Sequence, residues 1–118
     1  MRTAIASVLA LALAILPGIA MAHAQLQRAE PKVGSAGPAP QKVQLWFSEA
    51  IEPALSKAVV KDGAGKEVDA APGAVAADDH RRIDVAVPAL PPGTYRVEWS
   101  VVSVDGHKTS GNFTFTVK

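Results

Sequence analysis

The stretch TYRVEWSVVSVDGHKTSGNFTFTV, Thr94 to Val117, alternates apolar and polar residues on both sides of an Asp-Gly pair. The apolar face is made by Tyr95, Val97, Trp99 and Val101 before the pair and by Phe113, Phe115 and Val117 after it. A period of two residues is typical of β-strands that bury one face. Because Asp-Gly between alternating segments is a strong hairpin signal, we expect an antiparallel hairpin here.

The same alternation occurs earlier in the chain, with Gly and Pro between the segments and no helical period. We expect strands at 42–48, 57–62 and 82–88. The segment 67–82, EVDAAPGAVAADDHRR, is rich in small residues and is expected to be a solvated excursion between strands. Short, evenly spaced strands with turn-formers between them predict an all-β domain, a small antiparallel β-sandwich.

The N-terminus has the layout of a secretory signal peptide. Arg2 is followed by an apolar run from Ala4 to Leu16, then Pro17-Gly18 and small residues up to Ala22. An uncleaved membrane anchor is the alternative, since this stretch approaches the length of a short spanning helix. The Pro-Gly break and the Ala-x-Ala pattern favour cleavage. We therefore expect a signal peptide at 1–22 that is removed, leaving no stable membrane insertion.

Two cleavage patterns overlap in AMAHAQL, Ala20 to Leu26. Cleavage after Ala22 leaves His23 as the first residue of a domain at 23–118, whereas cleavage after Ala24 discards this histidine. Motif quality alone does not separate the two sites.

Composition limits the possible partners and ligands. The formal net charge is +1, so there is no single-sign field to attract nucleic acid or an anionic membrane. There is no cysteine, and Met1 and Met21, the two methionines, both lie in the leader. The exported domain would therefore have no sulfur ligand.

An N-terminal histidine changes the interpretation of the Asp-Gly hairpin. The α-amine and Nδ1 of His23 can close a six-membered chelate on a metal ion, His107 can add a third nitrogen, and Asp105 an oxygen. Three nitrogens and one oxygen in a plane suit Cu(II), and the lack of sulfur weighs against Cu(I). The amine, with an ordinary pKa of about 7.7–8.0, must lose its proton, so affinity should fall as the pH drops.

Each of these residues also has a simpler interpretation. Asp105 can serve turn geometry alone, and His107 can be an ordinary surface histidine. Glu49 can be a solvated acid at a strand end; its functional role would be to orient the amine of His23 without ligating the metal.

The whole of residues 23–118 resembles the CopC family of small periplasmic copper-binding proteins. The similarity lies in a leader cut just before His, in LWFSEAIEPALS, and in LPPGTYRVEWSVVSVDGHKTSGNFTFTV. The resemblance implies a Greek-key β-sandwich or barrel, immunoglobulin-like and related to cupredoxins. It also implies periplasmic Cu(II) binding through positions that match His23, Asp105 and His107, with Glu49 near the amine.

One departure from the family concerns Cu(I). Some members carry a methionine-rich Cu(I) loop, but the corresponding region, 69–82, has no methionine, so we expect His80 to be a solvated loop histidine. We expect a monomeric, non-enzymatic copper carrier, buffer or resistance protein, with a copper-transporting inner-membrane protein as a partner suggested by the resemblance. The alternatives are a copper-dependent oxidase that uses the N-terminal histidine, and a metal-free immunoglobulin-like module.

Overall fold

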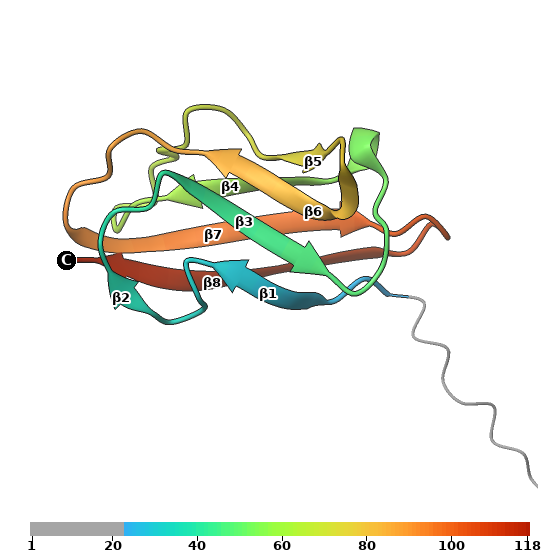
Figure 1. The fold of residues 1–118 in the computed structure, drawn as a ribbon, viewed down its shortest axis with the longest axis horizontal. Helices are drawn as coiled ribbons and strands as arrows, with labels where there is room; N and C mark the ends of the chain where they lie inside the picture. Colours follow the sequence, from blue (N-terminus) through green and yellow to red (C-terminus); the bar gives the residue numbers. More distant parts are fainter. Residues whose placement is uncertain (1–22) are drawn as a thin grey trace, which may run out of the picture.

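A computed structural model describes residues 23–118, which form two four-stranded β-sheets packed face to face (Figure 1). The strands are β1 (Leu26–Glu30), β2 (Ala36–Gly37), β3 (Lys42–Phe47), β4 (Lys57–Lys61), β5 (Ala74–Ala76), β6 (Asp79–Ala86), β7 (Gly93–Val102) and β8 (Lys108–Val117). One sheet has the order β1-β3-β6-β5 and the other β2-β8-β7-β4; a short 3₁₀ helix, η1 (Pro53–Leu55), precedes β4. The predicted β-sandwich is confirmed.

Most connections between strands cross from one sheet to the other, as in Greek-key and immunoglobulin-like sandwiches. The chain changes sheets between β3 and β4, between β4 and β5, and between β6 and β7, while β7 and β8 form a hairpin. One pairing departs from the antiparallel pattern, because the two-residue strand β2 pairs with β8 in parallel. This edge strand lies in the Pro- and Gly-rich segment between β1 and β3.

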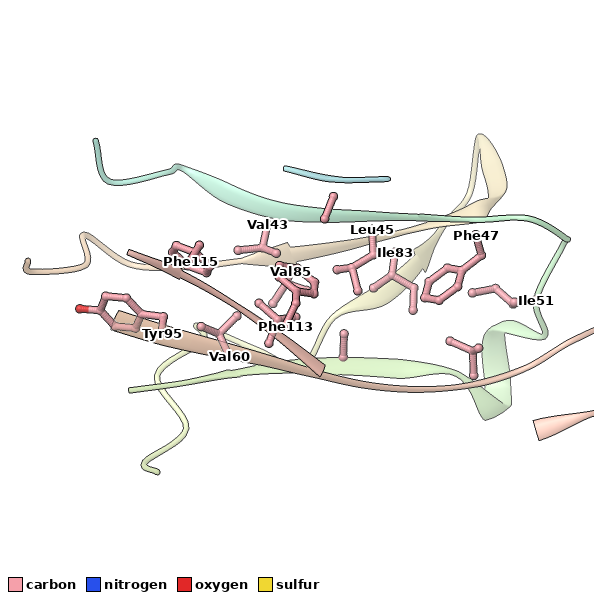
Figure 2. Close-up of a cluster of buried hydrophobic side chains, with 14 of the residues drawn as sticks. Val43, Leu45, Phe47, Ile51, Val60, Ile83, Val85, Tyr95, Phe113 and Phe115 are labelled. Atoms are coloured by element: carbon pink, nitrogen blue, oxygen red, sulfur yellow. The ribbon is translucent and has the colours of Figure 1, made fainter. Parts of the chain in front are cut away.

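The space between the sheets is filled by the apolar faces predicted from the alternation (Figure 2). The largest fully buried side chains are Phe47, Phe115, Leu45, Ile51, Ile83, Val43, Val60, Val85, Val97 and Val101. They come from both sheets. The inward-facing residues of each sheet therefore supply one half of a shared core. Trp99 packs edge-on against Phe47, with ring centroids 5.2 Å apart.

Segment 67–82 is mostly exposed, as expected, but the expectation that it is only a connection between strands is wrong. The Asp69 carboxylate accepts a hydrogen bond from the Val60 N–H at 2.8 Å, and the Gly73 N–H donates to the Ala58 carbonyl at 2.7 Å. The segment then forms β5 and the start of β6. Its small residues allow it to lie close against the sandwich: a Cβ on Gly73 would be 2.4 Å from the Val85 side chain.

The long β7–β8 hairpin carries its loop to one end of the sandwich. The two strands pair from Gly93 and Val117 to Val102 and Lys108, and the loop 103–107 follows. The start of the described chain and η1 lie at this same end, while the C-terminus lies at the other (Figure 1). Within residues 23–118, no helix is long and apolar enough to cross a membrane.

Candidate metal centre

The first described residues are fastened to both sheets. Thr109 of β8 donates a hydrogen bond from Oγ1 to the Ala24 carbonyl at 2.9 Å, and Ala24 is only 1% exposed. On the other side, the Gln25 N–H donates to Ser48 Oγ at 2.9 Å, and the Ser48 N–H donates to the Gln25 carbonyl at 2.8 Å. Ser48 directly follows β3, so residues 24 and 25 connect the two sheets at this end of the sandwich. Their hydrogen bonds fix the position of the backbone to which His23 is attached.

His23 and His107 lie together at this end although they are far apart in the sequence. Their ring centroids are 4.9 Å apart and the rings are at 84°, an edge-on contact. The two imidazole rings are therefore in direct contact at this end of the sandwich. The structure thus brings together the two histidines that the sequence nominated as metal ligands.

The third nominated residue, Asp105, lies beside His107 in the β7–β8 loop. Asp105 Oδ1 is 3.2 Å from His107 Nδ1, and the side chains are 44% and 49% exposed, so solvent and ions reach both. Gly106 between them has φ +92°, a conformation that favours glycine, and its N–H donates to the Ser103 carbonyl at 2.8 Å. The Asp-Gly turn and the possible ligand pair are therefore compatible interpretations of the same residues.

The electrostatics keep Asp105 ionised. A hydrogen bond from the Ser103 hydroxyl, and then one from His107, hold the pKa of Asp105 below its usual range. An anionic carboxylate is the form that binds a cation. The contacts with Ser103 Oγ and His107 Nδ1 both use Oδ1. Oδ2 takes part in neither contact, so a metal ion would meet this oxygen first.

Glu49, the fourth nominated residue, and His80, which was not expected to be a ligand, lie outside these contacts. Glu49 is half-buried next to Ser48, which pairs with Gln25; within residues 23–118 its carboxylate makes no hydrogen bond or ion pair. His80 is exposed at the start of β6, where its carbonyl accepts a hydrogen bond from the Ile51 N–H at 2.9 Å. That bond is a backbone contact and gives the His80 imidazole no place among the residues above.

The described side chains do not form a closed cage of ligands. Among residues 23–118, no group of three or more His, Asp or Glu side chains is arranged closely enough to hold a metal ion as it stands. What exists is a chain of pairs, His23 with His107 and His107 with Asp105. Cleavage before His23 would add an α-amine to these side chains as a further nitrogen donor.

Sequence reasoning missed two residues that organise this end, Ser103 and Thr109. Both continue the inward-facing rows of the hairpin, Ser103 after Val101 and Thr109 before Gly111. A polar residue at an inward position of a strand must find a partner, because burying an unsatisfied polar group is costly. That position in the alternation is the signal that could have found them.

The protein is thus an immunoglobulin-like β-sandwich. Two histidines and a carboxylate lie at the end of the sandwich where the described chain starts. The CopC domain model matches residues 26–118, so the chain belongs to the CopC family. It is 41% identical to copper resistance protein C of Escherichia coli, over 84% of each chain. It is 39% identical to protein YobA of the same species, over 82% of this chain and 80% of that one.

Solved structures agree with this assignment. CopC from Methylosinus trichosporium superposes with a TM-score of 0.75 at 34% identity, covering 81% of this chain and 94% of that one. PcoC of Escherichia coli, described as a methionine-rich copper resistance protein, superposes with a TM-score of 0.74 at 40% identity, covering 82% of this chain and all of that one. This chain differs from that description because its methionines are Met1 and Met21, outside the matched domain.

Proposed function

We propose that this protein is a periplasmic Cu(II) carrier or buffer whose processed N-terminus forms part of the metal site. The observation that carries the proposal is the contact between the His23 and His107 rings, 4.9 Å apart. This contact lies beside the Asp105–His107 pair, and His23 would be the first residue of a chain cleaved after Ala22. Membership of a family whose relatives include copper resistance proteins supports copper as the metal.

The donor set favours Cu(II) over other ions. His23 would supply its α-amine and Nδ1, His107 an imidazole nitrogen and Asp105 a carboxylate oxygen. Tetragonal nitrogen and oxygen coordination suits Cu(II), whereas soft sulfur ligands suit Cu(I). Residues 23–118 contain neither cysteine nor methionine, so a thioether site for Cu(I) cannot be built from them. Glu49 is proposed to orient the amine from outside the ligand set.

The position of the cleavage site is part of the proposal. Cleavage after Ala24 would remove a residue that is 1% exposed and whose carbonyl accepts the Thr109 hydrogen bond. Cleavage after Ala22 leaves these interactions intact and gives His23 a free amine. The packing of Ala24 therefore supports a signal peptide at 1–22 and an exported domain at 23–118.

We propose carriage rather than catalysis, with a membrane transport protein as the partner. The copper transport protein CutJ of Bacillus subtilis is 33% identical to this chain. The match covers 93% of this chain but only 21% of that longer protein. In that relative a similar domain is covalently joined to the rest of a transport protein. We infer a monomer that exchanges copper with a separate transport protein in the inner membrane.

Copper titration of the exported protein tests the proposal. The processed wild type should start at His23 by intact mass, bind one Cu(II), and show a nitrogen-rich EPR spectrum. His23→Ala should lose this spectrum, whereas His80→Ala, the matched control, should keep it. A start at Gln25, or a His23→Ala variant that binds as tightly as the wild type, would refute this site. Sustained ascorbate oxidation by the copper-loaded protein would refute carriage in favour of an enzyme.

A further inference from the structure

Ser103 is a polar residue in an apolar position. It directly follows β7, continues the inward-facing row after Val101 and is 0% exposed. Among residues 23–118, the only other buried polar side chain is Ser56, at 6% exposed. A buried hydroxyl lowers stability unless it is hydrogen-bonded, and at a core position an apolar residue would avoid that cost. The hydroxyl of Ser103 therefore needs an explanation beyond packing.

The hydroxyl lies inside the loop that carries Asp105 and His107. Ser103 Oγ contacts Asp105 Oδ1, the His107 carbonyl at 3.3 Å and the His107 N–H at 3.3 Å. A serine hydroxyl has one proton to donate and can also accept. Since hydrogen bonds to an ionised carboxylate are the strongest of this kind, the proton goes to Asp105. The same oxygen then accepts from the His107 N–H.

This bond sets the orientation of the carboxylate. Asp105 Oδ1 is directed toward Ser103 Oγ and also lies 3.2 Å from His107 Nδ1. An acceptor at this distance favours the His107 tautomer that carries its proton on Nδ1. The lone pair is then on Nε2, which stays available as a donor, and the Asp105 orientation leaves Oδ2 outside both contacts.

We propose that Ser103 is the positioning residue of the copper site, because its buried hydroxyl fixes the Asp105 carboxylate and, through it, the His107 tautomer. This inference deepens the proposed function and rests on it for the identity of the metal. It assigns Ser103 no contact with the ion. In metal proteins, loss of a group that orients a ligand typically lowers metal affinity by roughly 10–100-fold.

The test compares Ser103→Ala with Ser56→Ala. Ser56 Oγ accepts a hydrogen bond from the Val102 N–H at 3.0 Å, so its removal also deprives a partly buried backbone group of its partner at this end of the sandwich. Ser103→Ala should bind Cu(II) roughly tenfold or more weakly in a chelator competition and should change the EPR hyperfine splitting. Ser56→Ala should keep the wild-type affinity and spectrum even where its stability falls.

A metal-free measurement separates this inference from the proposed function. Imidazole ¹⁵N shifts of the apo wild type should show His107 protonated on Nδ1 at a pH where the ring is neutral. Ser103→Ala should shift His107 toward a mixture of tautomers, and Ser103→Thr, which keeps the hydroxyl, should restore the wild-type shifts. If Ser103→Ala does not fold, the proposal still requires that Ser103→Thr show the wild-type ¹⁵N shifts and the wild-type copper affinity.

Three outcomes would overturn the positioning role. They are unchanged ¹⁵N shifts in Ser103→Ala, an unchanged EPR spectrum and affinity in that variant, or equal losses of affinity in Ser103→Ala and Ser56→Ala. A wild type that does not bind Cu(II) while the tautomer shift follows Ser103 would instead refute the proposed function and leave the Ser103–Asp105–His107 linkage standing.

Discussion

Thr109 Oγ1 and the Ala24 carbonyl are joined by a 2.9 Å hydrogen bond that ties the N-terminal segment to β8. Ala24 connects the exposed His23 to the rest of the sandwich. This bond therefore fixes the backbone position from which the His23 side chain contacts His107. Because the bond is formed by the backbone of Ala24, no side-chain pattern in the N-terminal segment announces it. It connects the ordinary packing of the fold to the geometry of the proposed copper site.

Thr109→Val should loosen this attachment while keeping the β-branched shape of the side chain. We expect the free energy of unfolding to fall by about 1 kcal/mol, the usual net value of such a bond. Copper affinity should fall as well, because His23 loses its fixed starting point. Chelator competition and urea unfolding measure the two effects. Thr114→Val, at an exposed position of the same strand, is the control, and equal copper affinity in the two variants would contradict the anchoring role.

Copper should raise the thermal stability of the processed protein. An ion that binds only the folded state stabilises it by about 2.7 kcal/mol at a free concentration one hundred times its Kd. The melting temperature should therefore rise with Cu(II) and return to the apo value when a chelator is added. His80→Ala should respond as the wild type does and His107→Ala should not. A stabilisation that survives in His107→Ala would place the ion elsewhere.

Gly111 should not tolerate a side chain. A Cβ at this position would be 2.5 Å from Trp99 Cζ2, so Gly111→Ala must displace the indole that packs on Phe47. Overpacking of this kind costs about 1–3 kcal/mol. Urea unfolding followed by tryptophan fluorescence should show the loss of stability and a changed native emission spectrum.

Gly37→Ala is the matched control, because a Cβ there meets nothing within 4 Å. We expect its stability to stay within about 0.5 kcal/mol of the wild type, as for most surface substitutions. Equal stabilities of the two variants would show that Trp99 can move at little cost.

The outer face of the β1-β3-β6-β5 sheet should show a pH dependence that comes from Asp84. Burial alone would raise the pKa of Asp84, but hydrogen bonds from Arg82 and Gln44 outweigh it and lower the pKa below the ordinary value of 3.8. The lowered pKa stabilises the folded state at pH values above 3.8. That contribution is lost as the pH falls from 3.8 through the folded-state pKa.

Asp84→Asn should therefore be less stable than the wild type at neutral pH, and the difference should shrink below pH 3.8. The expected difference is below about 1 kcal/mol, because the pair is partly exposed. Urea unfolding across this pH range measures it. Glu30→Gln removes an exposed carboxylate from the same sheet, and a matching pH response in that variant would assign the effect to net charge instead of to the Arg82 pair.

The sequence predicted the strands that bury a full alternating face, and it missed those that do not. β1 contributes one buried residue, Ala29, and β5 is a three-residue strand, Ala74–Ala76, that pairs with β6. Neither carries enough apolar area for the alternation to be recognised. β2 is a short parallel pairing set by the surrounding fold, and no local pattern specifies it.

The metal-site residues divide in the same way. His23, Asp105 and His107 have side chains whose chemistry suggests ligation, so they could be nominated before the fold was known. Ser103 and Thr109 act through hydrogen bonds to a loop and to a backbone carbonyl, and these depend on how the ends of β7 and β8 meet the N-terminal segment. Their contribution depends on three-dimensional proximity, which residue type does not encode.

The burial of Ala24 directly after an exposed His23 has a consequence for the way copper would leave. Ala24 is hydrogen-bonded to Thr109, so in a chain that begins at His23 a rotation of that one residue about its link to Ala24 would withdraw two of the proposed donors. Neither the core nor either sheet has to open for this. A partner would then need to displace only His23, while Asp105 and His107 keep their place in the β7–β8 loop, to take the ion.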